Sequence, residues 1–268
     1  MGSGSAGTRY AVRALALGYV ALLLVVPLGL VAWRTFEDGV GPFLTAVTAP
    51  EAVHALVVTL QVALGALALN TVFGVGVALL LTRHDFPGRR ILDALVDLPV
   101  AVSPVVVGLA LVLVYGRFAS VGGWLEQHGV QVIFSVPGMV LATAFISLPL
   151  VVRAVAPVLE EAGEEQEQAA RTLGAGSVQT FRRITIPVIS GALGYGVVLC
   201  FARAIGEYGA VAVVSGRLVG QTQTLPLYVE ERFQNFDQPA AFAVATLLAA
   251  IAAVTLVSTR LLRSRGSS

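Results

Sequence analysis

The segment from residue 158 to residue 187 reads VLEEAGEEQEQAARTLGAGSVQTFRRITIP, and it separates two long apolar stretches. Five of its first ten residues are glutamates. The chain as a whole has the opposite character, because 56% of its 268 residues are hydrophobic and only 12% are charged. Soluble domains carry about 25% charged residues, so the sequence indicates a membrane protein with a polar insert. The net charge of +1 gives no basic surface for nucleic acid.

Two helices joined by a glycine turn are predicted within this insert. The run from Glu160 to Leu173 is rich in helix-forming residues, and its acidic side chains come before its arginine, as the helix dipole favours. Gly174 is expected to end this helix. Ser177 is expected to cap a second, short helix that reaches Pro187. The insert is therefore predicted to be a compact helical hairpin.

Six stretches are long and apolar enough to cross a bilayer, which takes roughly 20 residues per helix. The first is read as a retained helix, because it is too long for a cleaved signal. Prolines interrupt the third and fourth stretches, where neighbouring helices must satisfy the freed carbonyl groups. The predicted spans lie within residues 10–33, 53–81, 95–115, 130–152, 189–215 and 240–257.

The positions of the arginines predict the orientation of the chain in the membrane. Positive charge is disfavoured in short loops that are translocated to the outer side during insertion. Twelve arginines fall at the termini, in the second-to-third connection or in the insert, four fall on the other side, and Arg203 falls within a span. Both termini and the insert are therefore predicted to be cytoplasmic. The twelve are Arg9, Arg13, Arg83, Arg89, Arg90, Arg153, Arg171, Arg182, Arg183, Arg260, Arg263 and Arg265, and the four are Arg34, Arg117, Arg217 and Arg232.

The insert resembles the EAA loop of ABC-importer permeases. The resemblance rests on an Ala-Ala pair, a glycine four residues later, nine intervening residues and an Ile-x-hydrophobic-Pro sequence. It implies an all-α, polytopic membrane protein with six transmembrane helices and a cytoplasmic helical coupling loop, the type I ABC importer permease fold. The expected parts are an N-terminal transmembrane helix with the first external loop (residues 1–50), the permease core (residues 51–260) and a short cytoplasmic tail (residues 261–268).

In that family the EAA loop docks into a groove on the ATP-hydrolysing subunit. The resemblance therefore implies a dimer of ABC ATPases as partner, which uses ATP and magnesium, while this chain is non-catalytic and binds no cofactor. Gln168 stands where the pattern has glutamate, although Glu167 is adjacent. Phe181 is expected either to contact the ATPase or to pack against the permease's own helices. The expected coupling residues are Gln168, Ala169, Ala170, Gly174, Val178, Phe181, Ile184 and Pro187.

A second resemblance covers nearly everything after Glu51. Residues 202–216 read ARAIGEYGAVAVVSG and residues 220–227 read GQTQTLPL, and both are similar to sulfate and thiosulfate permeases of the W type. The pieces FPGR (86–89), LPVAVSP (98–104) and ISLP (146–149) fit the same group. This implies a bacterial cytoplasmic membrane protein, an unlike second permease subunit, and an extracytoplasmic sulfate-binding protein that meets residues 216–238. The alternative is a molybdate or tungstate permease, which tends to work as two identical chains.

Arg203 and Glu207 are ionisable residues within a predicted span, where such residues cost roughly 2.5–3.5 kcal/mol. Their spacing of four places them on one helical face, where they are expected to pair. Two interpretations stay open: the pair fixes helix packing, or Arg203 lies beside the anion path while Glu207 keeps the anion from binding too tightly. Ser103 and Ser147 are path candidates by residue type, although such side chains more often make interhelical hydrogen bonds.

The sequence speaks against two other classes of protein. An ion-coupled secondary transporter would leave the polar insert unexplained, and paired broken helices in two inverted repeats are not evident. An intramembrane enzyme would need a catalytic constellation, but His54, His84 and His128 lie far apart and form no metal motif. Cys200 lies in an apolar stretch and is expected only to pack.

Overall fold

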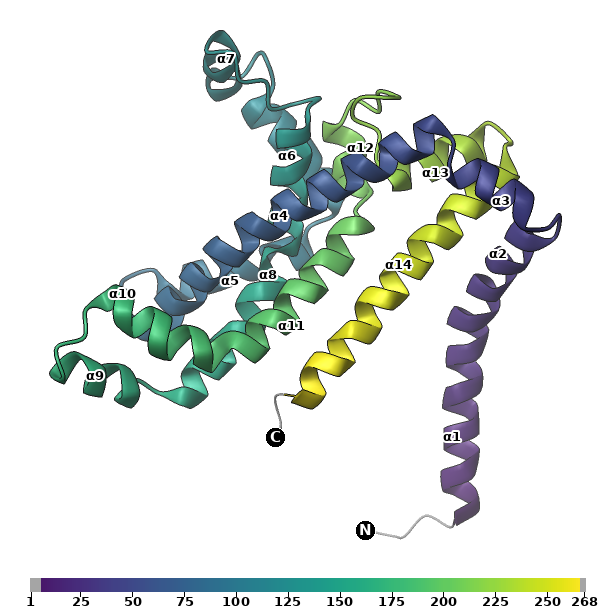
Figure 1. The fold of residues 1–268 in the computed structure, drawn as a ribbon. Helices are drawn as coiled ribbons and strands as arrows, with labels where there is room; N and C mark the ends of the chain where they lie inside the picture. Colours follow the sequence, from purple (N-terminus) through teal and green to yellow (C-terminus); the bar gives the residue numbers. More distant parts are fainter. Residues whose placement is uncertain (1–5, 266–268) are drawn as a thin grey trace.

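The computed structural model describes residues 6–265, and within that range the chain forms helices and turns without a strand. The long helices lie side by side, with α9 at one end of the bundle and α3, α7, α12 and α13 toward the other (Figure 1). The helices are α1 (Ala6–Val20), α2 (Val26–Phe36), α3 (Val40–Val47), α4 (Pro50–Arg83), α5 (Arg89–Ala101), α6 (Pro104–Tyr115), α7 (Ser120–Gln127), α8 (Val136–Ala162), α9 (Glu165–Thr172), α10 (Ser177–Thr180), α11 (Ile186–Ile205), α12 (Gly209–Val214), α13 (Leu225–Gln234) and α14 (Gln238–Arg265).

Two π-helical turns make separate helices continuous. The turn at Ala21–Val25 joins α1 to α2, and the turn at Phe181–Thr185 joins α10 to α11. Five continuous helical segments are consequently long and apolar enough to cross a membrane, and the pair α5 and α6 supplies a sixth if it forms one broken span. The prediction of an all-α, polytopic membrane protein with six spans is confirmed on this basis.

Helix α8 is the centre of the bundle. It is the most buried of the long apolar helices, and α4 and α11 pack along it. Val75, Val151, Val155, Leu159 and Ile189 fill the space between these three helices toward the α9 end. A second cluster, which includes residues from α4, α6, α8 and α12, fills the other end. The first helix differs, because α1 stands apart from the bundle (Figure 1) and its side chains from Tyr10 to Val20 are exposed.

Glycine permits the close approach of α4 to α8. A Cβ atom added to Gly74 would lie 2.9 Å from both Cβ and Cγ1 of Val151. The Cβ of Val151 is fixed to its backbone, so a side-chain rotation cannot relieve this contact. Gly76, two residues further along the same helix, has no atom within 4 Å of the corresponding position. Small residues at helix interfaces drive packing in membranes because they let backbones approach.

Gly74→Ala is therefore expected to destabilise the protein by about 1–3 kcal/mol, because the added methyl group overpacks the α4–α8 contact. Gly76→Ala is the matched control, and it is expected to be neutral or slightly stabilising because alanine is the better helix former. Thermal unfolding of the purified proteins in detergent measures both. Equal stability of the two variants would contradict this packing.

The third predicted span is not a straight helix. The chain breaks at Val102 and Ser103, and α5 and α6 are bent by 114° relative to each other. Pro104 supplies the reason, because a proline restrains the preceding residue to an extended backbone, and Ser103 has a ψ angle of 134°. Pro99 is accommodated within α5. The interruption of the stretch 95–115 by a proline was expected, and Pro104 is the proline that causes it.

Three predicted boundaries require correction. The fifth span ends at Ile205, and α12 is a separate helix after a turn. The fourth span continues to Ala162, and Gly163, with a φ angle of 63°, separates it from α9, so the predicted helix from Glu160 is divided. Gly176, and not Ser177, is the N-cap residue, and the helix that Ser177 begins is a continuous extension of α11 rather than a short separate one.

The termini lie at the same end of the bundle. The start of α1 and the end of α14 both point toward the end that carries α9 (Figure 1). Helices α1, α2 and α3 precede residue 50, and α14 continues past residue 260 to Arg265. The division into residues 1–50, 51–260 and 261–268 stays a prediction, and residues 266–268 of the expected tail lie outside the described range.

Candidate functional site

Two interruptions of the helical backbone meet inside the bundle. One is the break between α5 and α6, and the other is the turn between α11 and α12 at residues 206–208. A Cβ atom on Gly209 would lie 2.9 Å from the Cβ of Pro104, and one on Gly108 would lie 2.9 Å from the carbonyl oxygen of Ala210. Irregular backbone at membrane depth is tolerated where it is buried in protein or lines a water-filled cavity.

Arg203 and Glu207 form an ion pair at this meeting point. Nη1 of Arg203 lies 2.7 Å from Oε2 of Glu207, and their side chains are 41% and 2% exposed, respectively. The other carboxylate oxygen, Oε1, accepts a hydrogen bond of 3.1 Å from the backbone N–H of Ala210. The carboxylate thus holds the first turn of α12, while the guanidinium reaches partly open space. The predicted pairing is present, but it crosses the end of α11 instead of lying within one helix.

Ser103 lies at the α5–α6 break and is exposed. Its side chain makes no capping hydrogen bond to α6. The next residue, Pro104, is the one that contacts Gly209, so the structure brings Ser103 into the same region as the turn after Arg203. Ser103 and the Arg203–Glu207 pair therefore lie at the two breaks that meet.

Ser147 lies elsewhere, in a buried hydrogen-bond cluster that joins three helices. The amide of Asn70 on α4 donates to the hydroxyl of Ser147 at 2.9 Å and to the carbonyl oxygen of Ala144 at 3.0 Å. The same amide lies 3.5 Å from Sγ of Cys200 on α11. The hydroxyl of Ser147 donates to the carbonyl oxygen of Thr143 at 2.6 Å. The side chain of Ser147 is fully buried, which fits interhelical packing and not contact with an anion.

Ser147→Ala is therefore expected to lower stability by about 1 kcal/mol, because it removes one acceptor from a buried amide donor. Anion uptake by the variant is expected to stay close to that of the wild type. Thermal unfolding and uptake are measured on the same preparations. A variant with normal stability and lost uptake would instead indicate that Ser147 contacts the anion.

The predicted coupling hairpin is present, and its turn has a defined geometry. At the end of α9 the N–H of Ala175 donates to the carbonyl oxygen of Ala170 at 3.0 Å, and that of Gly174 donates to the carbonyl oxygen of Arg171 at 3.0 Å. This pair of bonds is the Schellman motif, which requires a left-handed residue at the position of Gly174. Gly174 has a φ angle of 84°. The glycine turn therefore fixes the direction in which the chain leaves α9.

The expected coupling residues do not share one environment. Gln168, Ala169, Gly174, Val178 and Pro187 are exposed, whereas Ala170, Phe181 and Ile184 are half-buried. Phe181 packs against the core between α4, α8 and α11, which favours the second of its two interpretations. Leu173 was not predicted, although it is 89% exposed beside the glycine turn. An apolar residue in so polar a segment was the signal for it.

Three further residues, one on α9 and two that contact it, were also missed. Arg83, Glu167 and Thr185 form a buried cluster of polar contacts. Arg83 was counted only as a positive charge near the membrane surface, and Glu167 only as a neighbour of Gln168. Their partners come from distant parts of the chain, so no local pattern could have indicated the cluster.

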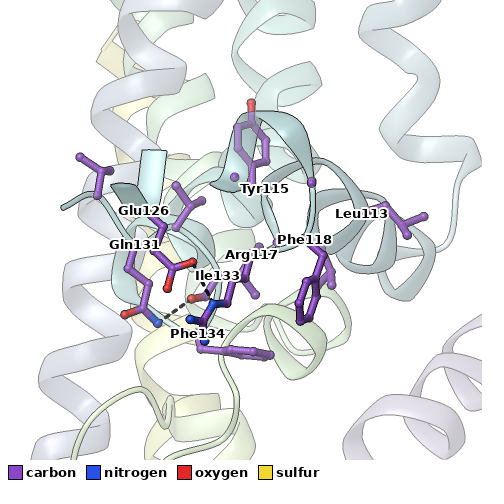
Figure 2. A pocket seen from close by; sticks show the side chains of 14 residues that line it. Leu113, Tyr115, Arg117, Phe118, Glu126, Gln131, Ile133 and Phe134 are labelled. Carbon is purple, nitrogen blue, oxygen red and sulfur yellow. Dashed lines mark hydrogen bonds and ion pairs between the residues drawn. The ribbon is translucent and has the colours of Figure 1, made fainter. Parts of the chain in front are cut away.

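A pocket of about 700 Å³ lies at the opposite end of the bundle from α9. The end of α6, helix α7 and residues 130–134 form its walls. Figure 2 shows that Arg117 and Glu126 point toward each other, with Nε and Oε2 3.8 Å apart, while Phe118 lies on the other side. Gln131 donates a hydrogen bond of 3.0 Å to the carbonyl oxygen of Ile133. The pocket was not predicted from the sequence.

The segment from residue 216 to residue 238 lies beside this pocket. The ring of Phe134, which lines the pocket, would lie 2.9 Å from a Cβ atom on Gly216. Further along, Nη1 of Arg217 lies 3.0 Å from Oε2 of Glu230. Thr59 on α4 accepts a hydrogen bond of 2.8 Å from the N–H of Leu225. The ion pair lies within the segment, and the hydrogen bond to Thr59 ties the segment to α4. Among residues 6–265, no group of three or more potential metal ligands occurs.

Comparison with known proteins identifies the family. A family model described as "Binding-protein-dependent transport system inner membrane component" matches residues 70–266. The Sulfate transport system permease protein CysW of Synechocystis sp. is 49% identical over 257 residues, which cover 96% of this chain and 93% of that protein. The protein of the same name from Escherichia coli K12 is 46% identical over 245 residues, 91% of this chain and 84% of that protein.

The fold has a counterpart among solved structures. A chain of a bacterial alginate ABC transporter, in complex with alginate pentasaccharide-bound periplasmic protein, matches with a TM-score of 0.77 and 18% identity, over 96% of this chain and 94% of that chain. At this identity the likeness bears on the fold alone, and it agrees with the predicted permease fold. The chain therefore belongs to the family of binding-protein-dependent transport system inner membrane components, the permease subunits of ABC importers.

Proposed function

We propose that this chain is a permease subunit through which an ATP-driven importer carries sulfate, or the related thiosulfate, into the cell. The observation that carries the proposal is the identity of 49% and 46% to two proteins named as sulfate transport system permeases, over nearly the whole chain. The residues that first suggested this substrate, Arg203 and Glu207, form the ion pair at the two meeting helix breaks.

The anion path runs along these breaks. Sulfate carries two negative charges, so a path through the membrane must offer it hydroxyl groups, backbone amides or a partly neutralised positive charge. Arg203 supplies the charge, and Glu207 neutralises it in part when no anion is present. Ser103, exposed at the α5–α6 break, supplies a hydroxyl group. A weak site of this kind suits a subunit that passes on an anion already selected by a binding protein.

The α9 hairpin faces the cytoplasm and couples transport to a dimer of ABC ATPases, which uses ATP and magnesium. Support comes from the arginines, twelve of which fall at the termini and connections assigned to this side. The termini and α9 also lie at the same end of the bundle (Figure 1). Leu173 and Val178 give the hairpin an exposed apolar tip on either side of the glycine turn, suited to a groove on the ATPase.

Two further partners complete the importer. The outer pocket and residues 216–238 meet an extracytoplasmic sulfate-binding protein, a role that fits a family named for its dependence on binding proteins. The second permease is an unlike chain. The exposed apolar side chains of α1 fit lipid or this second permease, because such a surface has no place in water.

Two alternatives remain to be tested against this proposal. A molybdate or tungstate permease would have the same fold and a related Arg-Ala-x-Gly-Glu sequence, and two identical chains would form its path. An ion-coupled secondary transporter would need the bundle alone to bind and release its substrate. Such a transporter would leave unexplained the polar α9 hairpin and its exposed apolar residue Leu173.

The test is uptake of radiolabelled sulfate by cells that lack this gene. Loss of uptake, restored by the wild-type gene and inhibited by unlabelled thiosulfate but not by molybdate, would support the proposal. Normal sulfate uptake with lost molybdate uptake would show that the chain is a molybdate permease. Copurification of two differently tagged copies of the chain in one complex would contradict the unlike pair.

A further inference from the structure

Arg83, the last residue of α4, is held in a buried position by three acceptors. Nε lies 3.3 Å from Oε2 of Glu167 on α9, Nη1 donates to the carbonyl oxygen of Leu159 at 2.9 Å, and Nη2 donates to that of Gly163 at 2.7 Å. The side chain is only 10% exposed. One guanidinium group therefore binds α9 and also the carbonyl groups at the end of α8, which have no partner within the helix.

Glu167 is held equally firmly. Its side chain is 11% exposed, and while Oε2 faces Arg83, Oε1 accepts a hydrogen bond of 2.9 Å from the hydroxyl of Thr185. Thr185 is buried in the turn that leads into α11. Each carboxylate oxygen thus has a partner from a different helix. Charge-assisted hydrogen bonds between guanidinium and carboxylate groups are roughly twice as strong as hydrogen bonds between neutral groups, and their planar geometry is more specific.

These contacts join four elements at one point: the ends of α4 and α8, helix α9, and the start of the α11 segment. Helix α9 also packs against α10 and the turn at Phe181–Thr185, and the chain joins it to the bundle through Gly163 and Gly174, which both have positive φ angles. Without the polar cluster, only these few packing contacts would oppose a rotation of α9 about the two glycines, because glycine tolerates many backbone conformations.

We propose that Arg83, Glu167 and Thr185 form a latch that makes α9 move as one body with α4, α8 and α11, so that motion of the ATPase reaches the two helix breaks. Helix α11 runs from the latch to Arg203, and α8 is the helix against which α4, α11 and α12 pack. The proposal rests on the proposed coupling function, and it assigns these residues a positioning role and no direct contact with the anion or with ATP.

The latch also accounts for glutamine in place of the expected glutamate. Gln168 is exposed on α9, and its amide donates only to Glu164 on the same helix, at 3.3 Å. The carboxylate that ties α9 to the bundle comes from the preceding residue and points inward. The surface that carries Gln168 is consequently free for the ATPase, and a carboxylate at position 168 is unnecessary for holding α9.

The experiment uses the complete importer in proteoliposomes, with the binding protein and ATP. Sulfate transported per ATP hydrolysed is measured for Glu167→Gln, which keeps the shape of the side chain, and for Arg83→Gln. The matched control is Asp85→Asn, which breaks the exposed ion pair of Asp85 with Arg89 in the same connection. Because breaking a buried ion pair costs far more than breaking an exposed one, the latch variants should lose about tenfold or more of this ratio and the control little.

Hydrogen–deuterium exchange of the backbone amides of α9 provides a second readout that does not depend on activity. In the assembled complex, Glu167→Gln and the milder Thr185→Val should raise the exchange rate of α9, the former by about tenfold or more, while α4 keeps its protection. Unchanged exchange in α9, or an unchanged ratio of transport to hydrolysis in variants that assemble normally, would overturn the latch. A wild-type complex that fails to couple ATP to sulfate would instead refute the proposed function.

Discussion

Sulfate uptake is expected to fall about tenfold or more when Arg203 is replaced by glutamine, because one hydrogen bond to a charged group contributes about 1.5–3 kcal/mol. The guanidinium is the positive charge at the meeting of the two helix breaks, and 41% of its side chain is accessible. Glutamine keeps much of the length but offers no charge to a dianion. Uptake of radiolabelled sulfate by cells that express each variant in equal amounts measures the effect.

Three companion variants separate a path residue from a packing residue. Arg203→Lys keeps the charge and should retain part of the uptake, although it loses the planar pairing with Glu207. Glu207→Gln should lower uptake as well, because the guanidinium is no longer neutralised and holds the anion longer. Arg34→Gln breaks the exposed ion pair with Glu37 and serves as the control, with no change expected. Normal uptake by Arg203→Gln in an assembled complex would leave the pair a packing element.

Gly174→Val is expected to abolish the stimulation of the ATPase together with uptake, although the protein still inserts in the membrane. Valine at a φ angle of 84° costs about 1–3 kcal/mol, because a branched side chain clashes with its own backbone there. No other atom lies within 4 Å of the position that its Cβ would occupy, so the expected effect comes from backbone strain and not from a clash at Cβ. The turn would open, and the exposed Leu173 beside it would change position.

Two variants at the same turn are controls for this expectation. Gly176→Val changes a residue with a φ angle of −72° and no atom within 4 Å of its added Cβ, so coupling should persist. Gly174→Asn should retain more activity than Gly174→Val, because asparagine tolerates the left-handed conformation better. Unchanged coupling in Gly174→Val would show that the direction of the turn does not matter.

The number of spans and the hairpin could be predicted because both depend on local composition. A stretch of apolar residues must be buried in lipid or protein. A polar run with a helix-ending glycine must lie outside the bilayer. The exact ends were less predictable, since Gly163 is a single residue in a run of helix formers and the prolines of the third stretch indicate a break without fixing its position. Gly163 breaks the helix with a positive φ angle and Ser103 through the proline that follows it.

The roles of the polar side chains depended on contacts between distant residues. Ser147 was a path candidate by type, and its burial became evident only with Asn70, which lies 77 positions earlier. Glu167 and Arg83 lie 84 positions apart, and nothing near either residue indicates a partner. Arg203 and Glu207 were correctly predicted to pair because they lie four positions apart, close enough for local geometry to bring them together.

Uptake by proteoliposomes tests the central claim most directly. The complex of this chain with its second permease and ATPases is reconstituted, with radiolabelled sulfate and the binding protein outside and ATP inside. The account predicts that sulfate accumulates only with hydrolysable ATP and the binding protein, and that Arg203→Gln and Gly174→Val abolish accumulation. Accumulation driven by a proton or sodium gradient without ATP would contradict it, and would make the chain an ion-coupled transporter.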